Sequence, residues 1–422
     1  MNRRNFLSQT ATTALAFYGA IRTVRAADSP NSTIRVAVMG LGRGLDHVNG
    51  VSGIQNVEVA TLCDIDDKRL EGGLKRMEGK QARPPQTSKD IRQVLEMKDL
   101  DAIFIAAPNF WHAPAAIMAC NAGKHVYVEK PGSHNMWEAE AIVRAARKND
   151  RKVQLGNQRR SFPGIIEGIQ KLKDGAIGTV RFGRSWYDNA RGSIGRGKEA
   201  SVPANLDYNL WQGPAPERPF VDNLVHYNWH WRWHWGGGEL ANNGIHSLDI
   251  VRWGLGVKHP TRVSCNGGRY HFDDDQETPD TTLAQFDFGG KVGASWDASS
   301  CHPRPAEKHP IASFYGDEGT MLIVGNGYQI LDSKGKEIGK GTGEGGDRAH
   351  MNNFLEAIRG NAKLNSEIEE GQLSTRLCHL GNIAYRVGRD LKIDGESGAI
   401  LGDDEAMKLW KREYRRGWEP KI

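Results

Sequence analysis

The chain has 422 residues and a formal net charge of +5, and 38% of its residues are hydrophobic and 25% charged. Fractions of this kind are typical of a folded globular protein and exclude a disordered one. A chain of this length exceeds what one core can organise and predicts about two domains.

The first 26 residues have the pattern of an export signal. Arg3 and Arg4 precede an uncharged stretch, Thr10–Ile21, and small residues surround a cleavage point after Ala26. The pattern predicts a twin-arginine signal peptide over 1–26, and therefore an exported, periplasmic protein. An N-terminal anchor helix is the alternative, but the apolar stretch is shorter than the ~20 residues that span a bilayer.

Removal of this segment changes the charge balance, because it holds four arginines and no acidic residue. The net charge falls to about +1, so no basic stripe remains for nucleic acid. No other apolar stretch is long enough to span a membrane. The five cysteines are scattered, with no C-x-x-C pair and an odd total. A protein exported in the folded state can keep reduced thiols, so we expect buried free cysteines.

After a polar linker over 27–33, short apolar strands alternate with amphipathic helices. This alternation predicts a doubly wound parallel sheet over 34–155. The predicted strands are Ile34–Met39, Val57–Cys63, Ala102–Ala106, Val126–Val128 and Val153–Leu155, and the predicted helices lie near Asp66–Met77, Asp90–Met97, Pro114–Asn121 and Trp137–Lys148.

The remainder, 156–422, is strand-rich and predicts an α+β domain with a large, mostly antiparallel open sheet. A helix over Pro163–Asp174 opens it, a loop over Asp188–Glu217 is expected to wrap the surface, and two late helices should pack back toward the first domain. A sheet face left open would normally be covered, which predicts a homo-oligomer. The strands are Val180–Trp186, Thr261–Tyr270, Thr281–Phe288, Gly293–Trp296, Ile311–Gly316 and Thr320–Val324, and the late helices are Arg348–Arg359 and Gly371–Val387.

A glycine-rich turn, which contains Gly40, Gly42, Arg43 and Gly44, directly follows the first strand. Backbone without a Cβ can approach a pyrophosphate closely, and the next helix presents its N-terminal N–H groups. Asp64 ends the second strand, where an acid binds a ribose 2′-hydroxyl and repels a 2′-phosphate. The unit predicts dinucleotide binding, with NAD preferred over NADP. Helix capping is the alternative for Asp64.

Two further strand ends bring polar side chains to the same sheet edge. Asn109 and His112 are predicted cofactor contacts, and His112 is expected to face the nicotinamide ribose; a packing histidine is the alternative. Glu129 and Lys130 end the next strand, and Pro131 restricts the backbone after them. A lysine beside a nucleotide cradle suggests redox chemistry on a small hydroxylated substrate.

Asn242, His246 and Asp249 share one helix face by their i, i+4, i+7 spacing. A histidine near Lys130 suits alcohol oxidation, since the hydroxyl loses a proton as its carbon loses hydride. The lysine would stabilise the developing alkoxide. Metal ligation and simple burial are the alternatives; a third strong ligand is not evident nearby, so no metal is predicted.

Further candidate substrate contacts come from two other segments. Tryptophans alternate with polar residues from His226 to Trp235, and Trp231 and Trp235 are candidates for stacking on a sugar face. A strand with one buried tryptophan face fits this alternation equally well. Gln158 and Arg159 follow another strand end and could reach substrate; a solvated polar cluster is the alternative.

Taken together, these motifs resemble the glucose–fructose oxidoreductase/inositol dehydrogenase/rhizopine-catabolism family, written Gfo/Idh/MocA. The resemblance implies a Rossmann domain followed by an α/β domain, with Lys130 as catalytic lysine, His246 as general base and Glu129 at the nicotinamide end of the cofactor. Many members have Asp where this chain has Asn242, and an amide cannot accept a proton. The resemblance covers essentially the whole mature chain and rests on Gly40-Leu41-Gly42-Arg43-Gly44, Cys63-Asp64, Glu129-Lys130-Pro131, Gly244-x-His246-x-x-Asp249, His350-Met351-Asn352-Asn353-Phe354 and Leu380-Gly381-Asn382-Ile383-Ala384-Tyr385.

Export sharpens the functional prediction, because the periplasm offers no ready pool of free nicotinamide cofactor. We therefore expect an oxidoreductase that acts on a sugar or glycoside hydroxyl with a tightly bound cofactor, recycled within each catalytic cycle. A redox-neutral glycoside hydrolase, which works by oxidation and elimination through a keto-sugar, is one alternative. An inactive carbohydrate-binding protein is another, although the pairing of Lys130 with His246 argues against it.

Overall fold

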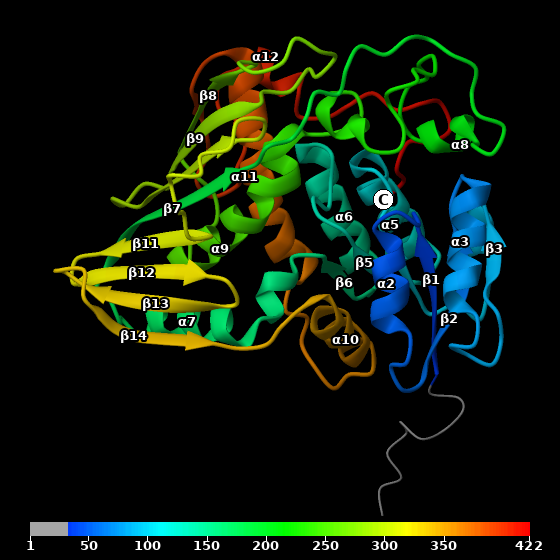
Figure 1. Ribbon diagram of the computed structural model, residues 1–422, viewed down its shortest axis with the longest axis horizontal. Coiled ribbons are helices and arrows are strands. Elements are labelled where there is room, and N and C mark those ends of the chain that lie inside the picture. Colours follow the sequence, from blue (N-terminus) through cyan, green and yellow to red (C-terminus); the bar gives the residue numbers. More distant parts are fainter. Residues whose placement is uncertain (1–32) are drawn as a thin grey trace, which may run out of the picture.

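The computed structural model describes residues 33–422 of the chain. The predicted signal peptide, 1–26, and nearly all of the linker lie outside the described residues. Figure 1 shows two parts side by side, a parallel sheet at one end and a larger sheet at the other, with helices between them.

The first part is a six-stranded sheet of order β3-β2-β1-β4-β5-β6 in which every pair is parallel. The order reverses between β1 and β4, so a crevice forms outside their carboxyl ends. This confirms the predicted doubly wound sheet. Its strands are β1 (Ile34–Met39), β2 (Val57–Cys63), β3 (Gln86–Ser88), β4 (Ala102–Ile105), β5 (His125–Val128) and β6 (Val153–Leu155), and its helices are α2 (Gly44–Val51), α3 (Asp67–Met77), α4 (Ile91–Leu95), α5 (Asn109–Asn121) and α6 (Met136–Lys148).

The central strands are apolar because both faces of the sheet are covered. Val36 and Val38 of β1 and Phe104 of β4 are completely buried. Helix α10 (Asp347–Ile358), from the far end of the chain, packs on α2, and its Met351 and Phe354 enter the same core. A late helix thus completes the first domain.

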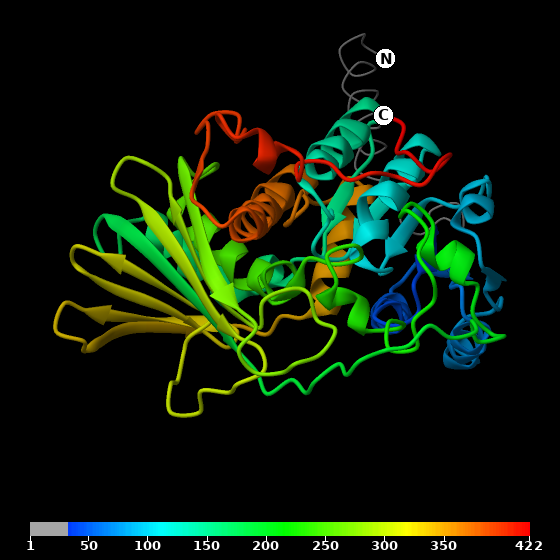
Figure 2. The ribbon, with the colours of Figure 1, turned by 90° about the horizontal axis from the view of Figure 1, so that it is seen from above.

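The second part is a nine-stranded sheet of order β14-β13-β12-β11-β7-β10-β9-β8-β15. Only β7 and β10 pair in parallel among its described strands, so the predicted, mostly antiparallel sheet is confirmed. Figure 2 shows it at one side of the molecule, with helices toward the first domain. The strands are β7 (Val180–Asp188), β8 (Arg262–Gly268), β9 (Thr281–Asp287), β10 (Gly293–Ser299), β11 (Ala312–Gly316), β12 (Gly319–Val324), β13 (Gly327–Asp332), β14 (Glu337–Thr342) and β15 (Leu391–Lys392), and the helices are α7 (Pro163–Lys173), α8 (Tyr208–Gln212), α9 (Ile245–Leu255), α11 (Ile368–Val387) and α12 (Asp404–Met407).

One segment differs from both predictions made for it. The Trp-rich stretch from His226 to Trp235 is neither strand nor flat platform but a series of tight turns around a short 3₁₀ helix, Asn228–Trp231. Many of its backbone bonds are turn bonds: the Trp235 N–H donates to the Arg232 carbonyl at 2.9 Å. The Trp231 carbonyl accepts the Glu277 N–H at 2.9 Å, so the stretch is also tied to the loop between β8 and β9.

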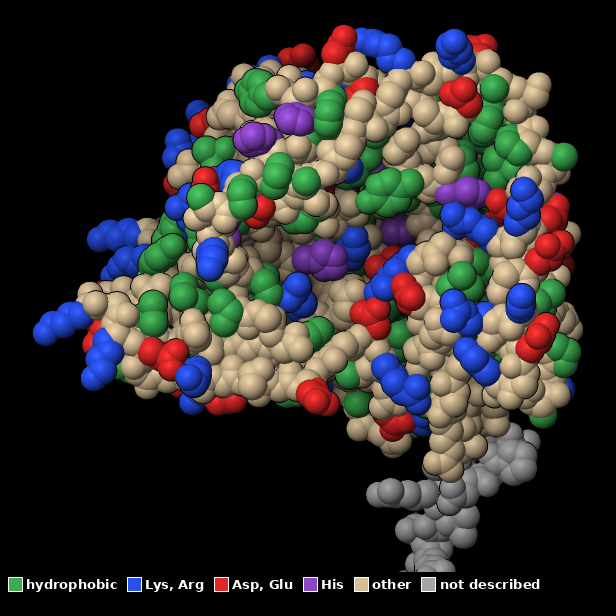
Figure 3. Space-filling model, in the orientation of Figure 1, with side chains coloured by type: hydrophobic (Ala, Val, Ile, Leu, Met, Phe, Trp, Pro, Cys, Tyr) green, Lys and Arg blue, Asp and Glu red, His purple; other side chains and the backbone are tan. Residues whose placement is uncertain are grey.

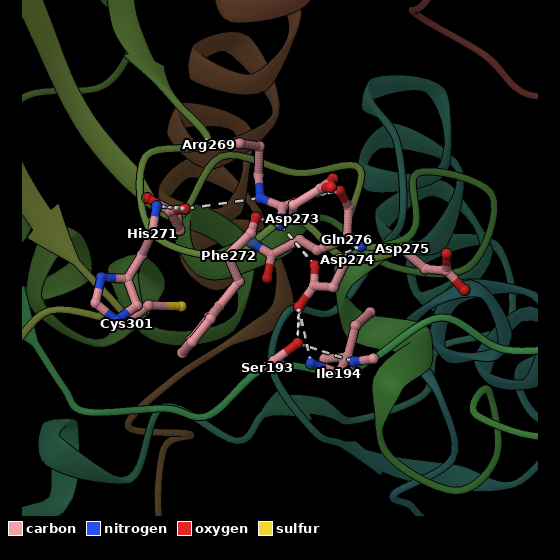
Figure 4. A network of polar contacts seen from close by, with 12 residues as sticks. Ser193, Ile194, Arg269, His271, Phe272, Asp273, Asp274, Asp275, Gln276 and Cys301 are labelled. Atoms are coloured by element: carbon pink, nitrogen blue, oxygen red, sulfur yellow. Dashed lines mark hydrogen bonds and ion pairs between the residues drawn. The ribbon is translucent and has the colours of Figure 1, made fainter.

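An extended segment over 189–207 leaves β7 and crosses toward the first domain; we name it the crossover segment (Figure 2). Figure 4 shows how its start is anchored: Ser193 Oγ and Ile194 N both donate to Asp274 Oδ2 at 2.8 Å. Arg269 donates to the other oxygen of that carboxylate at 2.5 Å. The buried end of Asp274 therefore ties the crossover segment to the loop between β8 and β9.

Two further expectations concern the described chain as a whole. All five cysteines are free and buried, which confirms the prediction of unpaired thiols. Within residues 33–422, no helix combines the length and the apolar character that crossing a membrane requires.

Candidate active site

A cavity of about 780 Å³ opens at the crevice outside the carboxyl ends of β1, β2, β4 and β5. Figure 3 shows a hollow between the two parts of the molecule, with histidine and charged side chains around it. Residues from both domains line the cavity, and most of the predicted site residues are among them. These are Gly40, Gly42, Arg43, Asp64, Asn109, His112, Glu129, Lys130, Gln158, Asn242 and His246.

The glycine turn fits a pyrophosphate because it has no room for side chains. Gly40 has a φ of +85°, and a Cβ there would lie 2.6 Å from the Ala106 carbonyl oxygen at the end of β4. A Cβ on Gly42 would lie 2.6 Å from the Arg69 guanidinium. Gly44 begins α2, so the N-terminus of that helix and its positive dipole end face the cavity.

Asp64 connects the end of β2 to this turn. Its Oδ2 accepts the Leu41 N–H at 2.6 Å and its Oδ1 accepts the Asp66 N–H at 3.0 Å. Burial raises the pKa of this carboxyl. The alternative role, capping α3, belongs to Asp66, which accepts the Lys68 N–H. Asp64 lines the cavity, and each of its oxygens, although it already accepts a backbone N–H, has a further lone pair for the predicted ribose contact.

Glu129 is a buried carboxylate, 4% exposed, held by His47 and Arg43 on two sides. His47 Nε2 lies 2.9 Å and Arg43 Nε 3.4 Å from its Oε1. Burial alone would raise the pKa of Glu129, but the contact with His47 and the charges of Arg43 and Lys130 hold it well below its usual range. Arg43 also pairs with Asp347 of α10, so the glycine turn, β5 and the late helix form one charged network.

Lys130 is held by the residue that departs from the family pattern. Its Nζ donates to the Asn242 backbone oxygen at 2.8 Å and to the Asn242 Oδ1 at 3.1 Å. Burial lowers the pKa of Lys130, and the charge of Glu129 opposes that shift. Asn242 lies on a π-helical turn, Leu240–Gly244, that immediately precedes α9.

His246 lies in the first turn of α9 and also lines the cavity. Burial, together with the positive charges of Lys130 and Arg159, lowers the pKa of its imidazole to about 3. The ring is therefore neutral near pH 7, which is the form that accepts a proton.

His112 lines the cavity without offering it a free nitrogen. Its Nε2 contacts the Ala107 carbonyl at 2.7 Å, and its Nδ1 contacts the Pro131 carbonyl. Both nitrogens are thus engaged by the backbone at the ends of β4 and β5. These contacts agree with the packing alternative, while the ring still lines the cavity, so the expectation that His112 faces a nicotinamide ribose stays a prediction.

Four predicted substrate residues do not line this cavity: Arg159, which lines a second, smaller one, and three buried side chains. Trp231 and Trp235 are 1% and 2% exposed, because Trp231 packs under the Arg191 guanidinium and Trp235 against Phe110. Asp249, 1% exposed, is paired on both oxygens with Arg160 at 2.7–3.1 Å. These three side chains are buried behind the residues that line the cavity.

The Trp-rich stretch nevertheless contributes residues that the sequence analysis did not select. Tyr227, Trp229 and His230 line the cavity. The His230 ring stacks on Trp229 with centroids 3.5 Å apart, and its Nδ1 contacts the Tyr227 carbonyl at 2.6 Å. Burial lowers the pKa of His230 to about 3, so a second neutral imidazole lies in the cavity. The alternating pattern indicated the right segment, but the residues of that segment that line the cavity lie at its beginning.

The crossover segment and the residues after it form a roof over the nucleotide end of the cavity. The Asp207 N–H donates to the Ile65 carbonyl at 2.9 Å, directly beyond β2. Asp66 accepts from Asn205 Nδ2 at 2.7 Å, and its other oxygen contacts His226 Nε2 at 2.9 Å. Trp211 of α8 follows and lines the cavity. A dinucleotide held in the cavity would therefore be enclosed by residues of both domains.

Comparison with known proteins agrees with this architecture. The model of an oxidoreductase family with an NAD-binding Rossmann fold, GFO_IDH_MocA, matches residues 34–157, and the model of its C-terminal α/β domain matches 180–286 and 328–420. The chain belongs to the Gfo/Idh/MocA oxidoreductase family. Its first domain is the NAD-binding domain, which confirms the predicted cofactor.

The alignments with individual curated relatives cover only part of each protein. The chain is 30% identical to an inositol 2-dehydrogenase of Salmonella typhimurium over 149 residues, 35% of this chain and 43% of that protein. It is 26% identical to an α-N-acetylgalactosaminidase of Shewanella oneidensis over 159 residues, 36% of this chain and 35% of that protein. The chain thus spans less than half the length of these curated relatives.

Solved structures match over most of the chain and show the shared fold. An aldose–aldose oxidoreductase from Caulobacter crescentus has a TM-score of 0.64 at 20% identity, covering 86% of this chain and 100% of that one. The WlbA dehydrogenase from Bordetella pertussis, in complex with NADH and UDP-GlcNAcA, has a TM-score of 0.66 at 17% identity, covering 86% and 99%.

Within residues 33–422, no group of three or more His, Cys, Asp or Glu side chains could hold a metal ion.

Proposed function

We propose that this protein oxidises a hydroxyl group of a sugar or glycoside, with an NAD that stays bound between turnovers. The observation that carries the proposal is the pairing of a neutral imidazole, His246, with an ammonium group, Lys130, in the cavity onto which the glycine turn opens. Relatives named for inositol, aldose and N-acetylgalactosamine chemistry support the substrate class.

The residues at one end of the cavity would bind the cofactor. Bound NAD supplies the hydride acceptor for an alcohol carbon. Gly40, Gly42, Arg43 and Gly44 would hold the pyrophosphate at the N-terminus of α2, and Asp64 would bind the adenosine ribose.

At the other end of the cavity, His246 would take the hydroxyl proton and Lys130 would stabilise the negative oxygen that remains. Asn242 holds Lys130 in place through its two oxygens. Asn109, Glu129 and Gln158 would complete the walls around the reacting groups.

Retention of the cofactor is supported by the roof over the cavity. The bonds of Asp66 to Asn205 and His226 tie this roof to the first domain, and ties of this kind would slow release of the cofactor. Retention also fits the proposal that residues 1–26 direct export to the periplasm, where lost NAD would not be replaced.

The experiment is to purify the mature protein from the periplasm, denature it, and identify the released nucleotide by mass spectrometry. We expect about one NAD(H) per chain, and a rise in absorbance at about 340 nm when sugars are added to the intact protein without oxygen. Protein that arrives without nucleotide and fails to bind added NAD would overturn the proposal.

A second candidate reaction is favoured by His230. Oxidation followed by elimination needs a second base, for the proton on the carbon beside the new carbonyl, and His230 is a neutral imidazole that lines this cavity in addition to His246. Release of free aglycone from a glycoside, without oxygen or any added acceptor, would identify this redox-neutral hydrolase. If no aglycone is released while the bound NAD is reduced, the result supports the oxidoreductase and not the hydrolase.

We also propose that a second copy of the chain covers the open face of the nine-stranded sheet. Leu283 is 53% and Tyr315 38% exposed there, which is unusual for large apolar side chains. Light scattering of the mature protein should give at least twice the mass of one chain, and a monomer at all concentrations would rule this out.

A further inference from the structure

A second cavity, of about 290 Å³, adjoins the active site and shares His246 with it. It is lined by Arg159, by Tyr187 at the end of β7, by Asn243 and Ser247 around the start of α9, and by the segment that contains His309. None of the glycine-turn residues line it. A substrate whose reacting hydroxyl lies at His246 can therefore extend away from the cofactor into this space.

Arg159 and Arg160 are neighbours in sequence with opposite environments. Arg160 is buried and neutralised by Asp249 through contacts of 2.7–3.1 Å. The Arg159 guanidinium has no hydrogen bond or ion pair with any side chain or carbonyl in the described part of the chain, and burial lowers its pKa with no acid to oppose the shift. A half-buried cation without a partner is costly, and an anion in the cavity would remove that cost.

The other polar groups of this cavity already have partners. Asn243 donates its amide to Glu239 at 2.5 Å, and Ser247 donates its hydroxyl to the Gly244 carbonyl at 3.3 Å. His309 contacts Glu307 at 3.0 Å and stacks on Trp186. Asp188 lies at the exposed rim and makes no ion pair with Arg159. Among residues 33–422, Arg159 is thus the unpaired charge that faces this cavity.

We infer that the substrate is a sugar acid, or a glycoside of one, whose carboxylate binds Arg159 in the second cavity while its hydroxyl meets Lys130 and His246. One guanidinium balances the single charge of a carboxylate and forms two parallel bonds with it. A phosphate ester carries more charge, and no second free cation lines this cavity in the described chain. The inference rests on the proposed function, and the carboxylate takes no part in the redox step: the proton goes to His246 and the hydride to NAD.

The test uses the full mature protein with its bound cofactor and matched pairs of sugars. D-glucuronate is compared with D-glucose, D-galacturonate with D-galactose, and D-glucose 6-phosphate serves as the phosphate probe; calorimetry gives Kd, and absorbance follows reduction of bound NAD. The variants are Arg159→Met, which removes the charge at similar length, and Arg159→Lys, which keeps it. Arg184→Met is the control, because Arg184 also stacks on Trp186 but lines neither cavity.

We expect at least one uronate to bind about tenfold or more tightly than its neutral partner, and Arg159→Met to abolish that preference while the Kd for the neutral sugar stays unchanged. Arg159→Lys should keep part of the preference, and Arg184→Met all of it. Equal binding of both members of each pair, a preference that survives in Arg159→Met, or tighter binding of the 6-phosphate would each overturn the inference. If neutral sugars reduce the bound NAD while uronates do not bind, the inference fails and the proposed function stands. If none of the sugars binds or reduces the bound NAD, the inference and the proposed function both fail.

Discussion

The ammonium group of Lys130 donates to both oxygens of Asn242, at 2.8 Å to the backbone carbonyl and at 3.1 Å to the side chain. Both acceptors are neutral, so they orient the lysine without adding an ion pair. Burial lowers the pKa of Lys130, and the nearby Glu129 charge only partly compensates. Lys130 acts as a cation in the proposed reaction, so the enzyme should lose activity as Lys130 loses its proton. Because the pKa of Lys130 is lowered, this loss should occur at a lower pH than the deprotonation of an exposed lysine.

Asn242→Asp should move this alkaline limit upward. A carboxylate beside Lys130 raises the pKa of the lysine, so the cation persists to higher pH. The measurement is kcat/KM against pH for the variant and the wild type, from about pH 7 to about pH 10.5. Asn242→Ala is the control, because it removes the side-chain contact and adds no charge. If the wild type and Asn242→Asp lose activity at the same alkaline pH, the deprotonation of Lys130 does not determine that limit.

Lys130→Met and His246→Gln should each lower kcat by on the order of 10²–10⁴-fold. The first removes the cation that would stabilise the alkoxide, and the second removes the proton acceptor. Neither residue belongs to the glycine turn, so the amount of NAD bound to purified protein should not change. Single-turnover reduction of bound NAD and mass spectrometry of the released nucleotide measure the two effects. Near wild-type turnover in either variant contradicts the role assigned to that residue.

The acidic limb of the rate profile should reflect the environment of His246. Its pKa is lowered to about 3, so the imidazole remains neutral and able to accept a proton well below its ordinary titration range. We expect kcat/KM to stay level from about pH 7.5 down to about pH 5, with no midpoint near 6.5. Circular dichroism at each pH separates loss of activity from unfolding. A limb centred near pH 6.5 in folded protein would contradict this environment for His246.

The sequence could predict the active-site edge of the first sheet because the strands and the motifs coincide there. Ile34–Met39 and Val57–Cys63 have the predicted bounds, and each is followed directly by a residue chosen for its chemistry, Gly40 or Asp64. Parallel strands place their carboxyl ends at one edge, so Asp64 and Lys130 line the same cavity although they are far apart in sequence. Patterns of local hydrophobicity are sufficient for this part of the fold.

Local patterns of hydrophobicity could not predict contacts between residues that are far apart in the sequence. Asp249 has the spacing to face Asn242 on a regular helix, but the π-helical turn and the buried Arg160 take it into the core. The strands Gly327–Asp332 and Glu337–Thr342 were missed because the second is glycine-rich and largely exposed, so it lacks an apolar alternation. Pairing with a neighbouring strand determines such segments more than their own residues do.

Loosening the roof should release the cofactor. Asn205→Ala removes the 2.7 Å bond to Asp66 that ties the crossover segment to the first domain. One such bond is worth about 1 kcal/mol, so NAD should exchange roughly fivefold faster. Exchange against isotopically labelled NAD gives the rate. Asn361→Ala is the control, because it removes a bond of similar length, 2.8 Å to Glu356, that is exposed and does not involve the crossover segment. Equal exchange in both variants would show that the crossover segment does not limit release.

The cysteine thiols should not react with thiol reagents until the protein unfolds. All five cysteines are free and buried, and burial raises the pKa of Cys120 and of Cys265 to about 12. The reactive thiolate is therefore scarce near pH 7, and the reagent has no access to it. We expect no reaction of the folded protein with a thiol-specific disulfide reagent at neutral pH. In denaturant without reductant, all five should react, at the rate at which the protein unfolds. A lower total would mean that a disulfide had formed, and rapid labelling of the folded protein would contradict the burial of that cysteine.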